Sequence, residues 1–477
     1  MKCVIFIILI IATGLTTSAD GSSHRPSHGT LFNWENHIRL MILDQYNNYG
    51  GPEHDRGLFR HTTHGMTPEH DIDLQTINFT PFEHYQWYYD ISRGFRTWFG
   101  SLDLGQFAIH HEINNDVELG SRFTMPLEVR RTFDQRQDRA IAILGLDYRL
   151  KGRHHIGFNH TFTEHKPDLD ATLYYKYGNH KDGFFRFNAT LPDWGNKSIY
   201  SIAENRDKDA FRHRRTYNIH PYYFSFTAAT PVRNHFRAEA MAGVLTQSEA
   251  EIGPIFHPQY IHRDRQNAHY SGLLVEYARS NVTAGLTWKH TFTRFSRVSV
   301  SDEADRYVDL GNRQYQKIVG AHASYRMGNI HLQNWISRTR FSDTQYDIVE
   351  RVDDFYPFDF EEYRYFMKSR VIWRPAERGV ITGLEWNADY RDMFHEFYSS
   401  RQDLIVAGYD YRRYYRDQIR SRNERITLII GYQFTRHAFL MAGVSIDIDG
   451  DYERGQGNRI EDPRRFDGGF ARLVLDW

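Results

Sequence analysis

The sequence predicts an all-β fold, a transmembrane antiparallel up-and-down β-barrel of about 18 strands, with roughly 16 to 20 as the range that its runs allow. Three observations predict this fold. Aromatic residues, which favour strands, make up 15% of a chain that is also 25% charged. Runs of alternating polarity fill most of the chain. Short and long connections between these runs alternate along the chain.

The alternating runs place apolar and charged residues on opposite faces. Val380, Leu384 and Trp386 share one face of a run, whereas Glu385 and Asp389 share the other. Because successive side chains of a strand point to opposite sides, the pattern predicts one face against lipid and one face against water. A barrel needs apolar residues at only every second position, so the chain can be hydrophilic on average.

The predicted strands follow one another from residue 82 to the end of the chain. They are 83–93, 96–108, 117–131, 138–150, 153–163, 169–178, 183–191, 217–229, 235–247, 269–279, 281–293, 314–327, 328–341, 362–374, 380–394, 421–435, 438–449 and 466–477. Their number is even, as a barrel with both chain ends on one side requires. Two places leave the range open, because the turn at Arg93 and Gly94 is tight and the stretch 404–415 also alternates.

The connections form two classes. The short turns lie near 151–152, 179–183, 231–234, 280, 328–329, 375–379 and 436–437. The long polar loops are 192–216, 248–268, 294–313, 342–361, 395–420 and 450–465. Membrane barrels have short turns on one side and long loops on the other, whereas a soluble sandwich has no reason to keep that order.

The first nineteen residues have the pattern of a secretory signal peptide. Lys2 precedes an apolar run, 4–12, and the small residues that follow end at Ala19, where cleavage is expected. The run is too short for a spanning helix. The single cysteine, Cys3, lies inside this signal, so the mature chain is expected to contain no thiol or disulfide.

Residues 20–81 form a histidine-rich segment that we expect to lie on the periplasmic side or inside the lumen. An amphipathic helix is predicted within 31–45 and could cap or plug the barrel mouth. His61, His64 and His70 have side chains that could bind zinc or copper. Their spacing matches no known metal site, and secreted polar loops often carry histidines, so no metal or other cofactor is predicted.

The last residues of the chain carry a family resemblance. Ala471, Leu473 and Leu475 occupy alternate positions before the terminal aromatic residue, Trp477. Such a closing strand resembles the assembly signal of bacterial outer-membrane β-barrel proteins, and no narrower porin family is recognised. We expect this strand to close the barrel against the first predicted strand, 83–93.

The resemblance covers the signal peptide and residues 82–477, the predicted barrel domain. It implies a location in the outer membrane of a Gram-negative bacterium, with outer-membrane lipid and the β-barrel assembly machinery as partners. The formal charge of −1 suggests no nucleic-acid partner. Nothing in the sequence indicates an oligomeric state.

The charged face of the runs predicts the lining of the lumen. The predicted lining residues are Glu118, Arg122, Glu128, Arg130, Asp147, Arg149, Arg237, Glu239, Arg326, Arg364, Arg370, Arg374, Glu385, Asp389, Arg391 and Arg425. Arginine fits an enclosed ionic wall, because its planar fork binds carboxylates and stays charged. The alternatives are that these charges neutralise one another in a structural network, or that arginine is simply preferred throughout the genome.

The predicted function is passive passage of small polar solutes through a porin-like channel, with anions favoured by the arginines. The alternatives are a non-conducting barrel that serves as a scaffold in a surface or secretion complex, and a barrel enzyme. No catalytic residue is predicted, because the nucleophile elbow, the phosphate-binding glycine loop and the zinc-protease motif are missing from the sequence. His110, His111 and Glu112 are adjacent, and adjacent strand residues face opposite ways.

Overall fold

The computed structural model describes most of the predicted barrel. The described residues are 94–103, 106–134, 138–163, 170–179, 183–191, 194, 197–201, 212–254, 262–279, 281–299, 310–346, 358–375, 377–398, 414–435, 438–448, 451–455, 458–462 and 466–476. In this part of the chain, no helix is long and apolar enough to cross a membrane. The predicted signal peptide, the histidine-rich segment with its helix, and Trp477 lie outside the described residues.

Within the described ranges, all regular secondary structure is β. The strands are β1 (Gly94–Asp103), β2 (Gln106–Glu118), β3 (Phe123–Asp134), β4 (Asp138–Arg149), β5 (His154–Thr163), β6 (Asp170–Asn179), β7 (Gly183–Leu191), β8 (Lys197–Ser201), β9 (Arg212–Ile219), β10 (Tyr223–Ala229), β11 (Phe236–Pro254), β12 (His262–Arg279), β13 (Val282–Ser299), β14 (Leu310–Met327), β15 (Ile330–Tyr346), β16 (Phe358–Trp373), β17 (Gly379–Tyr398), β18 (Tyr414–Thr435), β19 (Ala438–Asp447), β20 (Asp451–Gly455), β21 (Asn458–Asp462) and β22 (Phe466–Asp476).

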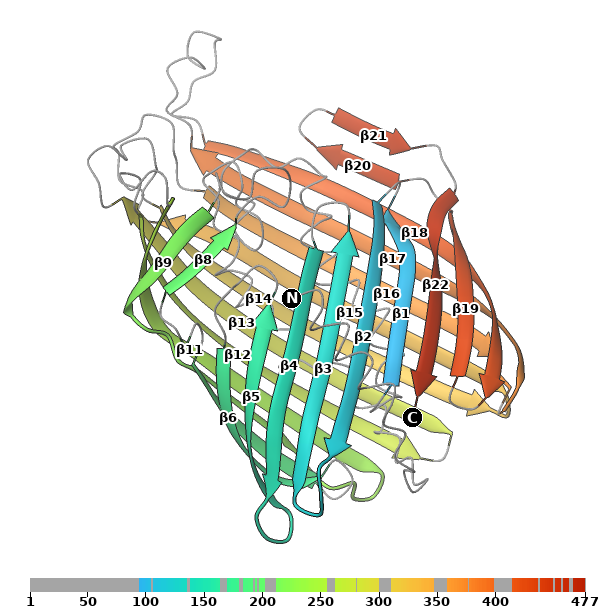
Figure 1. Cartoon of the computed structure of the whole chain (residues 1–477). Coiled ribbons are helices and arrows are strands. Elements are labelled where there is room, and N and C mark those ends of the chain that lie inside the picture. The colour runs from blue at the N-terminus through green and yellow to red at the C-terminus, as the bar shows by residue number, and fades with distance from the viewer. Residues whose placement is uncertain are drawn as a thin grey trace.

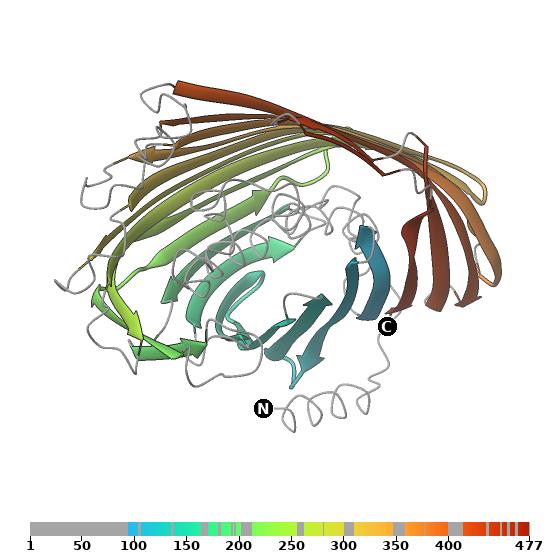
Figure 2. The ribbon, with the colours of Figure 1, turned by 90° about the horizontal axis from the view of Figure 1, so that it is seen from above.

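Antiparallel pairing closes 18 of these described strands into one ring. The ring runs from β1 to β7, continues through β10 to β19, and returns through β22 to β1. Figures 1 and 2 show the strands around a common interior, with β1 and β22 side by side. The predicted transmembrane barrel fold is therefore confirmed.

The closing contact differs from the prediction. β22 pairs with β1, where Leu473 lies opposite Thr97, and the predicted partner 83–93 lies outside the described residues. The predicted strand 96–108 is wrong, because the chain reverses between Asp103 and Gln106, which pair with each other. Glycine occurs both at the predicted turn and at this reversal, so turn composition alone did not distinguish them.

All the predicted short turns join neighbouring strands at one end of the barrel, hereafter the short-turn end. One further turn at this end contradicts the predicted strand 117–131. The chain reverses between Glu118 and Phe123, which end β2 and begin β3. Leu119 and Phe123 are exposed and keep the alternating pattern across the turn, which made two strands look like one.

At the opposite end, the long-loop end, the strands run further than predicted. The predicted loop 294–313 begins within β13 and ends within β14, which extend the hairpin beyond the membrane band. The predicted strand 217–229 is divided into β9 and β10 around Pro221. Proline has no N–H to donate to a ladder, so a strand is interrupted there. β8 and β9, like β20 and β21, extend hairpins past the ring (Figure 1).

One face of the ring carries a belt of exposed large apolar side chains, hereafter the apolar belt. Members of the belt include Leu144, Leu146, Ile156, Leu173, Val244, Leu273, Val275, Leu286, Trp288, Val319, Ile336, Val371, Val380, Leu384, Leu428, Ile430, Leu440 and Val444. Because paired residues of adjacent strands share a face, the register places these side chains on one continuous surface. A monomer that exposes so much apolar surface needs a partner phase, and lipid is that phase.

The other face points into the ring. Its side chains make contacts that skip a strand, as between Tyr174 on β6 and Asp147 on β4, whose hydroxyl and carboxylate oxygens are 2.8 Å apart. Such contacts are possible on the concave side of a curved sheet, where side chains converge. Polar side chains dominate the buried positions of this inner face, among them Asn188, Thr287 and Lys289.

A β-bulge in β11 changes which residues face outward. Leu245 pairs with Ala268 and Ser248 pairs with Gln266, so β11 has one extra residue between these pairs. Beyond the bulge, Glu249 lies on the outer face.

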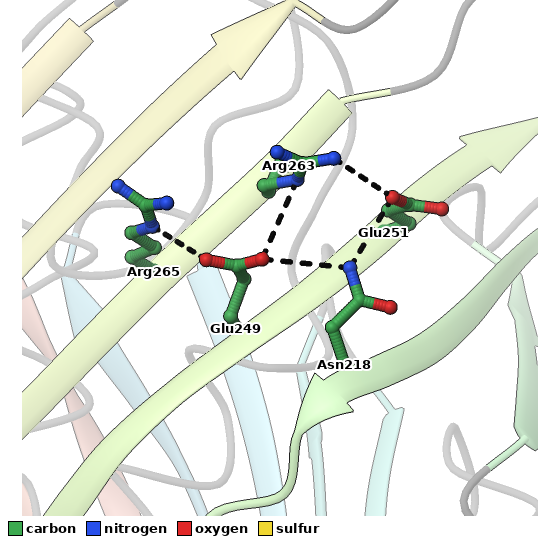
Figure 3. A network of polar contacts seen from close by, with 5 residues as sticks. All are labelled: Asn218, Glu249, Glu251, Arg263 and Arg265. Atoms are coloured by element: carbon green, nitrogen blue, oxygen red, sulfur yellow. Dashed lines mark hydrogen bonds and ion pairs between the residues drawn. The ribbon is translucent and has the colours of Figure 1, made fainter.

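A polar network covers the outer face at this place (Figure 3). The Glu249 carboxylate accepts a hydrogen bond from Arg265 Nε at 2.7 Å, and Arg263 pairs with Glu251 at 3.2 Å. From β9, the Asn218 side chain donates to Glu249 at 3.5 Å and to Glu251 at 3.2 Å. The network thereby holds the β8–β9 hairpin against the barrel wall.

Replacing Glu249 with glutamine is expected to loosen this hairpin. The Arg265 hydrogen bond, together with that of Asn218, lowers the pKa of Glu249 from its usual 4.5. The folded pKa is depressed, so the stabilisation is present above pH 4.5 and is lost as pH falls through the lowered value. Trypsin cleavage in β9 should therefore be slow at neutral pH in the native chain and faster in Glu249→Gln. Glu377→Gln, at the short-turn end, should leave β9 protected, and equal cleavage of the two variants would contradict the assignment.

Candidate functional site

The inner face of β16 carries four basic side chains, hereafter the basic row: Arg364, Lys368, Arg370 and Arg374. Their even-numbered positions place them on one side of the strand, with Arg374 directly after it. Arg364, Lys368 and Arg370 are buried. The row therefore extends along the wall from the short-turn end toward the long-loop end.

One carboxylate on β17 binds two members of the basic row. Glu385 lies opposite Arg370 in the register and forms an ion pair and a hydrogen bond with it. Lys368 Nζ lies 3.1 Å from the other carboxylate oxygen. The exposed fraction of each side chain is 2% or 3%. Charges so well removed from water are tolerated only when they are paired, so the three residues stabilise one another as a unit.

Arg374 connects the basic row to apolar residues near the short-turn end. Its Nε donates to Gln433 Oε1 at 2.7 Å, and its guanidinium carbon lies 4.6 Å from the centre of the Phe439 ring. Phe439 belongs to a buried inner cluster: Ile372, Ile381, Ile429, Phe439 and Met441. The inner wall of β16–β19 is thus apolar at the short-turn end and basic further up.

A second polar network lies on the inner face of β4–β7. Asp147 accepts from the Tyr174 hydroxyl at 2.8 Å and contacts His155 Nδ1 at 2.7 Å. Gly157 stands between them in the register, and a Cβ at this glycine would lie 2.0 Å from the Tyr174 ring. The missing side chain lets the ring cross the strand and reach the carboxylate. The Arg186 guanidinium lies 4.3 Å over the same ring.

The inner face of β11–β14 holds further acid–base pairs. Arg237 and Glu239 lie 3.4 Å apart on β11, and both are buried. Glu276 on β12 lies 3.4 Å from His322 Nε2 on β14, across β13. The wall therefore combines carboxylates and cations in several places.

The structure brings together two pairs of predicted lining residues, Arg370 with Glu385 and Arg237 with Glu239. Asp147 contacts His155 and Tyr174, which were not among the predicted lining residues. Four predicted residues lie toward the short-turn end without such a pair: Glu118, Arg122, Arg149 and Arg326. Arg122 lies in a turn rather than on a strand and donates to the Tyr148 hydroxyl at 3.4 Å.

The remaining predicted lining residues have described backbone positions on β3, β17 and β18, and their side chains lie outside the described set. They are Glu128, Arg130, Asp389, Arg391 and Arg425. In the register, Arg391 lies opposite Arg364 of the basic row. Of the predicted assembly signal, Leu473 and Leu475 lie opposite Leu440 and Ala438 in the pairing of β22 with β19.

The sequence reasoning missed Lys368, Glu276 and His322. Lys368 shares the parity of Arg364 and Arg370, so the same alternation rule would have found it. Glu276 and His322 come from different hairpins, and no local pattern joins them. His61, His64 and His70 lie outside the described residues, and within those residues no group of three ligand side chains gathers as a metal site would.

No family model matches the chain, and no curated protein matches it in sequence. The solved structures similar to this chain include the following three. A bacterial polysaccharide outer-membrane secretin shares 7% identity at a TM-score of 0.35, covering 81% of this chain and 100% of that one. OccK10 (OpdN) of Pseudomonas aeruginosa shares 10% identity at 0.34, covering 81% and 98%. The anion-selective porin of Comamonas acidovorans shares 10% identity at 0.32, covering 80% and 98%.

Likenesses at this level concern the fold and define no narrower family. The closed antiparallel ring, the apolar belt and the opposed short turns and long loops are the features of bacterial outer-membrane barrels. The chain is thus an outer-membrane-type β-barrel on the strength of its own structure.

Proposed function

We propose that the barrel is a passive channel for small polar solutes and that its inner wall favours anions. The basic row supports this proposal. All four members of the row are cations on one face of the wall, and Glu385 is a carboxylate that binds two of them, Lys368 and Arg370. Cationic rows on a pore wall attract anions and repel cations.

The contacts of Glu385 also indicate which chemical class of solute the inner wall would bind. Its two carboxylate oxygens bind an ammonium group and a guanidinium group at once. Guanidinium groups bind planar carboxylates and phosphates through paired hydrogen bonds. An anionic solute near Arg364 or Arg374 would meet cations of the same kind, and we therefore propose small carboxylates or phosphates as the favoured solutes.

Bilayer recording tests the channel. The purified barrel in a planar bilayer should conduct, and its reversal potential in a salt gradient should indicate preference for chloride over potassium. Lys368→Gln should move the permeability ratio toward one, because it removes a wall charge. Lys317→Gln, on the outer face, should leave the ratio unchanged. Absence of conductance would refute the channel, and conductance without anion preference would refute the role of the basic row.

A non-conducting barrel that acts as a scaffold is the second candidate. The near-complete burial of Lys368, Arg370 and Glu385, and the apolar cluster next to them, favour it. In that case the inner charges stabilise the wall and meet no solute. The bilayer experiment separates the two candidates, because the scaffold gives no current while the barrel remains folded in detergent.

A further inference from the structure

The buried inner cluster on β16–β19 is covered, although it stands on the lumen face of a single sheet. Its side chains are 0% to 4% exposed. The outer face of the same strands shows how much the sheet neighbours alone can cover. There, Leu384 and Ile430 of the apolar belt are 46% and 64% exposed. A second layer of atoms therefore lies over the cluster.

The curvature of the ring does not account for this burial. Figure 2 shows β4 on the opposite side of the ring from β17 and β18. The inner side chains of that opposite wall are more accessible at the same end, because Asp147 is 14% and His155 is 22% exposed. The additional cover is therefore specific to the wall that carries the cluster.

The loops at the long-loop end are too far away to provide this cover. Ile381 lies about 55 Å along β17 from Tyr398, where the strand ends, at about 3.3 Å per residue. The loop 399–413 must return to the wall, so it reaches at most about 25 Å from it. The loop 347–357 of the same wall is shorter. At the short-turn end, 374–378 and 436–437 are taken up in joining neighbouring strands.

The chain before β1 begins at the same end as the buried inner cluster. Gly94, the first residue of β1, lies opposite Asp476 of β22 and Asn114 of β2. Ala438, next to the turn 436–437, lies opposite Leu475, which places this start at the short-turn end. Both edges of β1 are paired from its first residue. The preceding residues therefore cannot add a strand to the ring beside β1.

The stretch directly before β1, residues 82–93, has the composition and the length to reach the cluster. It contains Phe82, Tyr85, Trp87, Tyr88 and Tyr89, and it lies outside the described residues. Because β22 alone separates β1 from β19, the near side of the cluster is about 10 to 15 Å from the start of β1, and its far side on β16 is about 25 Å away. A stretch of this length spans up to about 40 Å.

We propose that residues 82–93, hereafter the aromatic stretch, fold into the lumen from the short-turn end and pack on the buried inner cluster. Aromatic side chains bury large apolar areas, and the cluster is the apolar part of the inner wall within their reach. The aromatic stretch thereby narrows the lumen beside Arg374, the end of the basic row. The contact covers the cluster equally in a channel and in a scaffold, so it does not depend on conduction.

Disulfide trapping in the full barrel tests this contact. Cys3 lies in the predicted signal peptide, so the mature chain is expected to contain no competing thiol. Trp87→Cys, Tyr88→Cys and Tyr89→Cys are each combined with Met441→Cys, and the folded barrel in detergent is oxidised with copper phenanthroline. We expect an intramolecular disulfide in at least one pair, because three consecutive side chains point in different directions. Leu440→Cys, at the adjacent outward position, should form none.

Alkylation of Ile381→Cys by a water-soluble maleimide measures the cover independently. This thiol should react slowly in the otherwise native chain. It should react about tenfold faster or more when Trp87, Tyr88 and Tyr89 are all replaced with serine, because the lost apolar contacts let the stretch open. Replacing Trp34 with serine, in the predicted helix of the histidine-rich segment, should leave the thiol protected.

Three outcomes would overturn the proposal. A disulfide between Trp34→Cys and Met441→Cys, with none from the aromatic stretch, would assign the cover to the predicted helix. A cross-linked product of twice the mass would assign it to a second copy of the chain. Equal alkylation rates with and without the three aromatic side chains would show that the stretch does not cover the cluster. None of these measurements uses ion current, so they stay separate from the test of the proposed channel.

Discussion

Replacing Glu385 with alanine is expected to destabilise the barrel by about 3 to 5 kcal/mol, the usual cost of leaving a buried charge without its partner. Lys368 and Arg370 would lose the carboxylate that both contact while staying 2% and 3% exposed. Urea unfolding in detergent, followed by tryptophan fluorescence and by the heat-dependent gel shift of folded barrels, measures the free energy of unfolding.

Glu361→Ala is the matched control for this prediction. Glu361 pairs with Arg340 on the outer face, where the two side chains are 33% and 52% exposed. Exposed pairs contribute about 0 to 1 kcal/mol, so the control should unfold close to the native chain. Similar small effects of the two alanines would mean that water reaches the Glu385 unit and that its charges are screened.

Replacing Leu473 with arginine is expected to prevent most of the protein from inserting into the membrane. Leu473 lies opposite Thr97 and Leu440, so it stands where the ring closes. A charge on the lipid face of a barrel costs about 2 to 4 kcal/mol near the bilayer centre. Here the cost falls on the strand that closes the ring, and unpaired strand edges are prone to aggregation. The yield of folded barrel in the membrane fraction measures the effect.

Val474→Arg provides the same substitution at the adjacent position. Val474 lies opposite Phe439 in the register, so its position is on the face of the wall that points away from lipid. We expect substantial insertion of this variant, and insertion of Leu473→Arg at the same level would contradict the assignment of faces. The sequence-based expectation that Trp477→Asp also impairs insertion stays a prediction, because Trp477 lies outside the described residues.

Much of the ring could be predicted from the sequence because strand alternation has a period of two. Val380 and Leu384 could be assigned to one face without knowing their neighbours, and the structure exposes both on the belt. Turns at which a glycine separates two clearly alternating runs, such as the turn at Gly328, were also predicted correctly. The first hairpins were not predicted correctly, because the residues around Gly94 and Gly105 are compatible with a turn and with a strand equally well.

The pairs on the inner wall could not be predicted. Alternation states which side a residue faces, and the register between strands decides which residue it meets. Arg370 meets Glu385 because the β16–β17 turn aligns them, and a shift of two residues would have preserved the alternation and broken the pair. Tyr174 meets Asp147 because Gly157 leaves room between them, a condition visible only in three dimensions.

The single extra residue in β11 has a consequence for both surfaces of the wall. If the same sequence formed a regular strand without the bulge, Glu249 and Glu251 would follow the parity of Leu245 and line the interior. Arg263 and Arg265 would then remain outside without their carboxylates. The bulge therefore acts as a sorting point for charge, since it moves two negative groups from the interior to the outer face, where two arginines neutralise them.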